Sequence, residues 1–324
     1  MTSSLRALRR RLITPGPSLM PKTVGGFHEK SPESRELLET VGHTFLAGYA
    51  HAVEARSPAE AEERLEQVPR RFRGFAYEGA GMGFAILDAV PIWSSGNVAR
   101  FLAGRGEFHN YMIYVGVGWA MAKLPRFLWP KSSEFDPLLH WLVLDGYGFH
   151  QAFFHTDKYV TRHHVDHDFP WPGGRWGAYA NRAIDQGIGR ALWFVGGTDV
   201  DRVASLVDGY DAARHPDLYA GVGLAATYAG GSTATELRRL RDLAGDHRPQ
   251  LAQGSAFAAE ARIRAGLLVP HNEVATGALC AISPHEAARI SLQARPVETP
   301  RGDLPAYEVW RQTIAEQFVT LGRY

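Results

Sequence analysis

Residues 185–194 read Asp-Gln-Gly-Ile-Gly-Arg-Ala-Leu-Trp-Phe, and their arrangement of small and apolar residues recurs along the chain. Each copy has a polar or small residue, a glycine, any residue, a glycine or alanine, and then an apolar stretch. The copies begin at Glu78, Val115, Asp145, Gln186, Ala220 and Gln253. Their first glycines are separated by 37, 30, 41, 34 and 33 residues. This spacing is typical of repeats in which each unit is a hairpin of two helices.

Helix-start signals precede several copies at a similar distance. Ser57-Pro58, Thr198-Asp199 and Ser232-Thr233 stand before three copies, and Ser or Thr is a good N-cap because its hydroxyl satisfies an unpaired amide at the helix start. Ser57-Pro58 and, after the last copy, Ser283-Pro284 read as an N-cap followed by a first-turn proline. Amphipathic stretches at 59–67, 200–210 and 234–243 then lead to the next glycine motif. Each unit is therefore predicted to be one helix, a turn, and a second helix that carries the glycines. Further helices are expected at 34–55 and 307–321.

The predicted fold is all-α, an antiparallel array of helical hairpins of the α-solenoid or TPR type, because strand signals are weak throughout. Residues 1–33 are expected to form an irregular N-terminal arm and residues 34–324 a single domain. Residues 156–178, rich in His, Pro, Trp and Gly, are expected to form a long inserted loop.

Composition excludes several classes of protein. The 324 residues are 45% apolar and 21% charged, which is typical of a folded globular chain. The net charge of +1 lacks the basic surplus of a nucleic-acid-binding protein. No apolar run is long enough to span a membrane, and a single cysteine, Cys280, excludes an internal disulfide. These features predict a cytoplasmic protein.

The N-terminal arm carries a short basic, amphipathic pattern. Four arginines alternate with three leucines, namely Arg6, Arg9, Arg10 and Arg11 with Leu5, Leu8 and Leu12. Such a pattern suits peripheral contact with an anionic membrane or an acidic partner. The alternative interpretation is a solvated tail.

The motif glycines also allow two interpretations, since a glycine inside a helix costs about 1 kcal/mol relative to alanine. Their small size permits close helix packing, or it makes room for a ligand pressed against the backbone. Polar residues stand directly before four of them: Glu78, Asp145, Gln186 and Gln253. On equivalent helices these residues would line one inner surface.

Candidate site residues follow from this row. Asp145, His150, Asp185 and Arg190 lie on apolar stretches and are the candidates for acid–base work or substrate orientation. Aromatic side chains would line a groove for an elongated apolar molecule together with the polar row, and those expected there are Trp119, Tyr147, Phe149, Trp193 and Phe194. The alternative is a polar ladder that fixes the register between repeats.

Histidine is concentrated in one segment, where six of the fourteen lie between His140 and His167. His163, His164 and His167 with Asp168 offer the donors that zinc or iron takes. However, His164 stands where a zincin helix needs its glutamate, and an exposed polar loop explains the cluster equally. Whether any cofactor binds stays open.

Five blocks of this sequence resemble one known family, the UnbL-type proteins of enediyne antibiotic gene clusters. The blocks are 26–28, 72–82, 144–150, 185–194 and 251–257, within a resemblance that extends from about residue 6 to residue 320. The resemblance implies a role in converting a polyene, made by an iterative polyketide synthase, into the enediyne core. It also implies gene neighbours of the UnbV and UnbU types, the latter a membrane protein similar to ion-translocating redox subunits. It supplies no catalytic residues.

Three functional hypotheses are thus open. The first is an accessory protein, or an enzyme, that holds a polyene intermediate in the aromatic groove. The second is a non-catalytic scaffold that binds UnbV-type and UnbU-type proteins, because helical repeats present long concave surfaces. The third is a metalloenzyme that uses His163, His164 and His167.

Overall fold

The computed structural model describes residues 23, 25–91, 94–172, 174–297 and 303–322, and every regular element within them is helical. The α-helices are α3 (Pro32–Glu54), α4 (Pro58–Leu65), α5 (Arg70–Ala89), α6 (Asn97–Leu102), α7 (Asn110–Lys123), α8 (Trp141–Phe154), α9 (Ala180–Val195), α10 (Val200–Asp208), α11 (His215–Ala229), α12 (Ala234–Leu243), α13 (Arg248–Arg264), α14 (Pro270–Leu279), α15 (Pro284–Gln293) and α16 (Ala306–Leu321). Short helical turns join them: η1 (Arg105–His109), η2 (Arg126–Leu128), η3 (Ser132–Glu134), η4 (Asp157–Thr161), η5 (Gly174–Tyr179), η6 (Ala212–Arg214) and η7 (Gly245–His247). The all-α prediction is confirmed.

Side-chain caps begin several of these helices where the sequence predicts them. Ser57 and Ser283 accept hydrogen bonds from the backbone amides three residues ahead, and a proline follows each cap. At the start of α12, Thr233 and Glu236 form a reciprocal capping box. Because the caps satisfy amides that a helix leaves unpaired, they define where each helix begins.

All six glycine motifs lie on helices that pack in sequence against one another. These inner helices are α5, α7, α8, α9, α11 and α13, and α3 packs on α5 at one end of the row. Helices α10, α12 and α14 form a second layer behind α9, α11 and α13. The motif glycines therefore lie on helices, as predicted, but only short helical turns precede α8 and α9, so the structure does not form the predicted hairpin in every unit.

The inner helices run in the same direction. The rings of Trp141 and Tyr179, at the starts of α8 and α9, are 4.7 Å apart, and those of Phe149 and Phe194, near the ends, are 5.2 Å apart. The indole of Trp193, near the end of α9, donates to the carbonyl of Gly230 just after α11. Equivalent positions of neighbouring helices therefore lie at the same height, which brings the polar residue of each motif into one layer.

The glycines allow the inner backbones to touch. A Cβ atom at Gly187 would lie less than 3.0 Å from the carbonyl oxygen of Asp145, and one at Gly221 would meet the carbonyl oxygen of Gln186 in the same way. The second glycine of a motif contacts the next helix. A Cβ atom at Gly189, for example, would collide with the carbonyl oxygen of Leu218. Close packing thus accounts for the glycines, and it forces the first side chains of each motif toward the interior.

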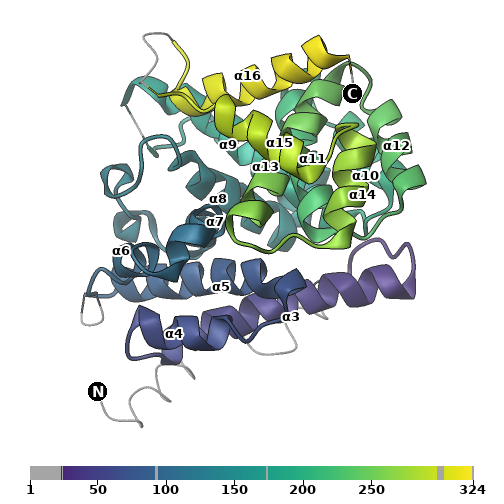
Figure 1. Ribbon diagram of the computed structural model, residues 1–324. Helices are drawn as coiled ribbons and strands as arrows, with labels where there is room; N and C mark the ends of the chain where they lie inside the picture. The colour runs from purple at the N-terminus through teal and green to yellow at the C-terminus, as the bar shows by residue number, and fades with distance from the viewer. Residues whose placement is uncertain (1–22, 24, 92–93, 173, 298–302, 323–324) are drawn as a thin grey trace.

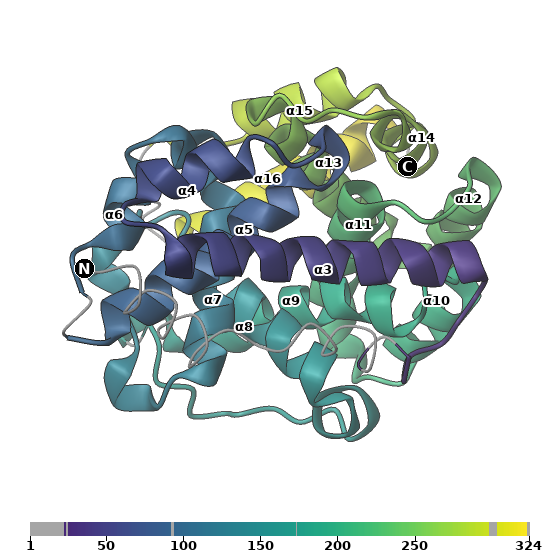
Figure 2. The ribbon, with the colours of Figure 1, turned by 90° about the horizontal axis from the view of Figure 1, so that it is seen from below.

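The row of inner helices curves back toward its own beginning. Arg262 of α13 donates to the carbonyl of Arg71 at the start of α5, 3.0 Å away, and also to the carbonyl of Tyr228 on α11. Figures 1 and 2 show α3 along one side of the molecule and α16 along the opposite side. His28 and Lys30, just before α3, bond to Val195 and Gly231 near the ends of α9 and α11. The inner face is consequently covered at both ends.

Two further predictions concern segments at the margins of this core. Residues 156–178 contain η4 and η5, with an irregular stretch between them. Most of the predicted N-terminal arm, including its arginines, lies outside the described residues, and α3 begins at Pro32. Among the described residues, no helix combines the length and apolar character needed to cross a membrane.

Candidate functional site

Three ionisable side chains from three inner helices meet in the interior. Arg190 of α9 donates through Nη1 to Oδ1 of Asp145 on α8, and its Nη2 lies 3.9 Å from Oε1 of Glu78 on α5. The side chains are almost fully buried, with Glu78 3%, Asp145 1% and Arg190 4% exposed. Two carboxyl groups therefore share one guanidinium in a region without bulk water.

Two neutral side chains extend this group. Gln186 donates to Oδ2 of Asp145 at 2.7 Å, and its amide is hydrogen-bonded to the Tyr307 hydroxyl of α16 at 3.0 Å. We call Glu78, Asp145, Gln186, Arg190 and Tyr307 the central cluster. It contains three of the four residues of the predicted polar row, so the structure does bring that row together. Sequence analysis missed Tyr307, because α16 lies outside the repeat.

Burial sets the protonation of Glu78. Its pKa is raised to about 7, chiefly by removal from water; the Arg190 charge opposes this shift, the Asp145 charge adds to it, and the neighbouring Trp119 indole lowers the value. Asp145 holds two hydrogen bonds from charged or amide donors, whereas the contacts of Glu78 are the longer ion pair to Arg190 and the Trp119 indole. Glu78 is thus the carboxyl group that can exchange a proton near neutral pH.

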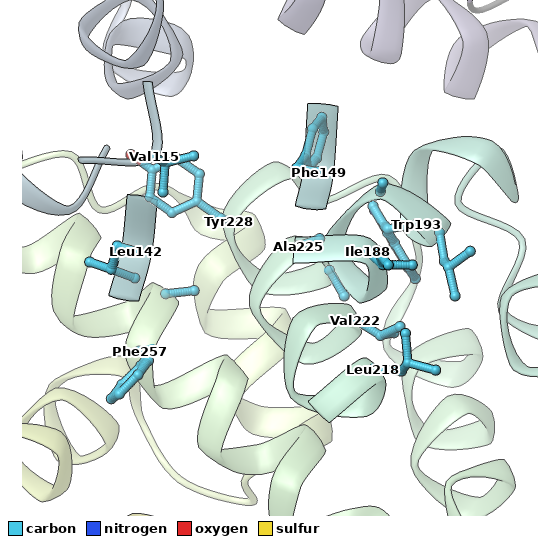
Figure 3. Packing of buried hydrophobic residues seen from close by; sticks show 14 of the residues in the cluster. Val115, Leu142, Phe149, Ile188, Trp193, Leu218, Val222, Ala225, Tyr228 and Phe257 are labelled. Atoms are coloured by element: carbon cyan, nitrogen blue, oxygen red, sulfur yellow. The ribbon is translucent and has the colours of Figure 1, made fainter. Parts of the chain in front are cut away.

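Two small apolar cavities adjoin the cluster on either side of Arg190. The first, of about 40 Å³, is lined by Asp145, Arg190 and Tyr228 and by apolar side chains of α7, α8, α11, α13 and α16. Figure 3 shows four of its lining residues, Val115, Leu142, Tyr228 and Phe257, on four different helices. The second, of about 30 Å³, includes Glu78, Arg190 and Trp119. Each cavity accommodates only a few atoms.

A second buried charge group fastens α16 to the core, and we call it the α16 cluster: Arg182, Asp217, Glu308, Arg311 and Tyr179. Arg311 lies 2.7 Å from Asp217 and 3.0 Å from Glu308, and Arg182 bonds to the same two carboxylates. Burial raises the pKa of Glu308, but Arg311 and Arg182 outweigh it and the pKa is lowered. Two cations thus balance two anions, an arrangement that stabilises the position of α16.

The last member of the polar row joins this second group. Oε1 of Gln253 accepts a hydrogen bond from Nε of Arg311 at 3.4 Å. Gln253 is therefore one step removed from the central cluster. A signal for Arg311 exists in the sequence, since it stands among Trp310, Ile314 and other apolar residues of a helix.

Two predicted catalytic residues lie elsewhere. Asp185 accepts two hydrogen bonds from Arg214, at 2.5 and 2.9 Å, and burial raises its pKa to about 6 despite this pairing. His150 packs against Trp119 and Phe154, and neither ring nitrogen has a hydrogen-bond partner. Burial, with the charges of Lys123 and His155, lowers its pKa to about 3, so His150 is a neutral core residue.

The predicted aromatic residues are distributed over the core. Trp119, Phe149 and Phe194 line the second cavity. Trp193 is fully buried, and its indole N–H donates a hydrogen bond to the carbonyl of Gly230. Tyr147 packs edge-on against Phe169 of the 156–178 segment. The inner face is thus filled by side chains rather than left as an open aromatic groove.

The histidines of the 156–178 segment do not converge. The His163 ring lies 4.1 Å from that of Tyr210, and the His164 ring packs on Tyr159. Across the described residues, no group of three or more His, Cys, Asp or Glu side chains is placed to hold a metal ion. His163, His164 and His167 do not form such a group in this structure.

A larger hollow lies on the surface of the described part of the chain, and its lining includes no residue of either cluster. It measures about 540 Å³ and is formed by the end of α5, α6, the outer side of α7, and η2 and η3. Small apolar residues such as Ala85, Ala99 and Ala120 form much of its wall, with Asp88 and Glu134 among its polar groups. At its edge, Phe127 is 84% exposed.

These features define an all-helical protein with a buried ionisable centre enclosed by small cavities. The chain belongs to the family described as "Protein of unknown function (DUF1702)", whose model matches residues 4–318. Comparisons with curated proteins and with solved structures give no match.

Proposed function

We propose that this protein acts on a polyene intermediate during the maturation of an enediyne polyketide core, and that the central cluster carries out acid–base chemistry there. The observation that carries the proposal is the Glu78 carboxyl, buried beside Arg190 and next to apolar cavities, with a pKa of about 7. A buried group poised near neutrality is typical of a general acid or base. The resemblance to UnbL-type proteins supplies the pathway.

Distinct roles follow from the contacts of the three charged residues. Glu78 is the proton donor and acceptor, because it has the fewest partners. Arg190 holds Glu78 and Asp145 in place and supplies positive charge to the reacting atoms. Asp145, fixed by Gln186 and Arg190, keeps the guanidinium oriented.

The cavity volumes bear on how a polyene is held. A space of about 40 Å³ accepts the reacting carbons but not a whole chain. The second cavity lies across Arg190 and has a wall formed by Leu38, Val41 and Phe45 of α3. Outward movement of α3 would open the second cavity and movement of α16 would open the first, and a chain that entered either would meet Arg190, which lines both.

A strain that makes the enediyne core provides the test. Replacement of the native gene by Glu78→Gln should stop conversion and cause the polyene to accumulate, because the amide cannot exchange the proton. Glu62→Gln is the matched control: Glu62 is also buried with a pKa raised by burial, but it bonds to the backbone of Gly106 away from both cavities. Core formation at the native level with Glu78→Gln, at equal protein levels, would refute the proposal.

The second candidate is a scaffold for UnbV-type and UnbU-type proteins, and the exposed surface hollow beside Phe127 favours it. This role would suit an α-solenoid, the finer arrangement that we infer from the repeat spacing. Phe127→Ser should then abolish co-purification with those proteins, whereas Glu78→Gln should leave co-purification unchanged. A cytoplasmic location, with the basic arm touching a membrane, fits either role.

A metalloenzyme remains the third hypothesis, and metal analysis addresses it directly. Purified protein that holds one equivalent of zinc or iron, and loses it in a variant with His163, His164 and His167 replaced by alanine, would support it.

A further inference from the structure

Two residues that line the first cavity carry hydrogen-bond donors that have no acceptor among the described residues. They are Nε of Arg190 and the hydroxyl of Tyr228, both buried. The other two nitrogens of the guanidinium face Asp145 and Glu78. A buried donor without a partner costs about 1–3 kcal/mol, so an unpaired donor in a core calls for an explanation.

The surroundings of Tyr228 keep its hydroxyl a donor. Arg262 stacks over its ring at 4.0 Å, and Phe75 packs edge-on against it. The hydroxyl lies against Gly74 of α5, where a side chain would collide with it. Burial raises the pKa of Tyr228, so the hydroxyl keeps its proton at neutral pH.

The remaining unpaired group of this cavity has an acceptor nearby. Tyr111 also has a hydroxyl without a bond of good geometry, but it lies beside Glu260, whose charge interacts with it. The other hydroxyl, that of Tyr307, is bonded to Gln186. Arg190 and Tyr228 are therefore the donors that await an acceptor.

The charge around the cavity specifies a neutral acceptor. Glu78 and Asp145 already face Arg190, so an anionic ligand would meet two carboxyl groups. The apolar lining, which includes Met112, Leu142 and Phe257, suits a hydrocarbon chain. A carbonyl oxygen fits this requirement, because it has two lone pairs that can accept both hydrogen bonds and it brings no proton of its own.

We propose that Arg190 Nε and the Tyr228 hydroxyl together bind the carbonyl oxygen of a conjugated, apolar substrate. This inference rests on the proposed function and names the substrate class more closely: a polyene conjugated to a ketone or thioester carbonyl. The bound carbonyl places the neighbouring carbons near Arg190, at the boundary between the two cavities.

The test compares two synthetic probes with the full chain. One is a conjugated tetraene methyl ketone, and the other is the matched hydrocarbon in which a methylene group replaces the carbonyl oxygen. The wild-type protein should bind the ketone at least about tenfold more tightly, which corresponds to one or two added hydrogen bonds. Raman spectra should show the carbonyl stretch of the bound ketone shifted to lower frequency.

Tyr228→Phe removes one donor and nothing else that the protein uses. It should reduce the preference for the ketone about tenfold, return the carbonyl stretch toward its free value, and leave hydrocarbon binding unchanged. The thermal midpoint should stay equal or rise, because an unpaired hydroxyl is lost. Tyr111→Phe is the matched control on the same cavity; it removes the hydroxyl beside Glu260 and should leave the preference unaltered.

Several results would overturn the inference: equal affinity of the wild-type protein for both probes, binding of neither probe, or an unchanged preference in Tyr228→Phe. If Tyr228→Phe fails to fold, the affinity ratio and the Raman shift of the wild-type protein still decide. Failure here is separable from failure of the proposed function. Polyene accumulation with Glu78→Gln but no ketone preference refutes only the carbonyl site, whereas ketone preference with normal conversion by Glu78→Gln refutes only the acid–base role.

Discussion

At each crossing of the inner helices, a carbonyl oxygen of one helix occupies the space that a Cβ atom would need on the other. Gly221 is an example, with the Gln186 carbonyl and the Arg190 amide at that position. Both obstacles are backbone atoms, which cannot rotate away as a side chain can. The helix-helix distance itself must increase if the glycine is replaced.

Gly221→Ala should therefore destabilise the protein by about 3 kcal/mol or more, as overpacking does in a rigid core. Gly277→Ala is the control, because Gly277 lies within α14 with nothing near its missing side chain. That change should stabilise by about 0.5–1 kcal/mol through helix propensity and backbone entropy. Urea unfolding of both variants measures the difference, and equal midpoints would contradict the packing role of the glycine.

The buried carboxyl of Glu78 makes stability depend on pH. The folded protein keeps its proton to about pH 7, while the ordinary pKa is 4.5, so stability falls as the pH rises between these values. Between pH 4.5 and pH 8, the free energy of unfolding of Glu78→Gln should rise relative to that of the wild-type protein by on the order of 3 kcal/mol. The reason is that folding raises the pKa of Glu78 from 4.5 to about 7.

Unfolding free energies across this range measure the effect. Glu63→Gln, on the exposed side of α4, should follow the wild-type curve. A Glu78→Gln curve parallel to that of the wild-type protein would show that Glu78 is ionised throughout.

At the scale of the helix, α16 carries both a wall of the first cavity and half of a buried charge cluster. Tyr307 and Trp310 line the cavity, while Glu308 and Arg311 face Arg182 and Asp217. Since the carboxylates are only 2–3% exposed, loss of one cation leaves negative charge uncompensated in the interior.

Arg311→Met should accordingly cost about 3–5 kcal/mol and loosen α16, which hydrogen exchange of residues 306–321 would register. Arg239→Met is the comparison: the Arg239–Asp201 pair is 60% and 54% exposed, so its loss should leave the thermal midpoint unchanged. Similar behaviour of the two variants would mean that the α16 cluster does not hold the helix.

Many of the helices and their first residues are predictable from the sequence, because helix caps and periodic apolar faces are local properties. Ser57, Thr233 and Ser283 cap their helices where expected, and the glycine motifs lie on inner helices. The partner of Asp145 lies on another helix, at Arg190, 45 residues away. Local pattern cannot reveal that α3 and α16 cover the inner face, since the pair Arg182–Glu308 spans 126 residues.

The same limit explains the misplaced candidates. Asp185 and His150, like Asp145, are polar residues on apolar helices. They point in other directions, however: Asp185 is bonded to Arg214, and His150 packs among aromatic rings. Tyr228 gives no sequence signal beyond a hydroxyl on an apolar helix. Its importance appears only when its neighbours are known.

At the scale of the whole molecule, the curved row of inner helices makes distant parts of the chain depend on one another. Arg262 near the end of α13 bonds to the start of α5 and to α11. The first cavity needs residues from α7 to α16 to be enclosed. An open repeat array would instead lose stability in proportion to the units removed.

A chain ending at Gly231 should therefore fail to fold cooperatively, even though it keeps α3 to α11. Circular dichroism during urea unfolding should show a broad transition for this fragment and one sharp transition for the full chain. A sharp transition of reduced midpoint for the fragment would favour independent, additive units.

The backbone contacts at the glycines also constrain how such a chain can change in evolution. One residue inserted or deleted within an inner helix rotates the rest of that helix by about 100°. The two glycines of a motif contact the two neighbouring helices, so an insertion before them would remove both contacts together. Length variation among relatives is then expected in the connections and the outer layer, whereas the number of residues within each inner helix should stay the same.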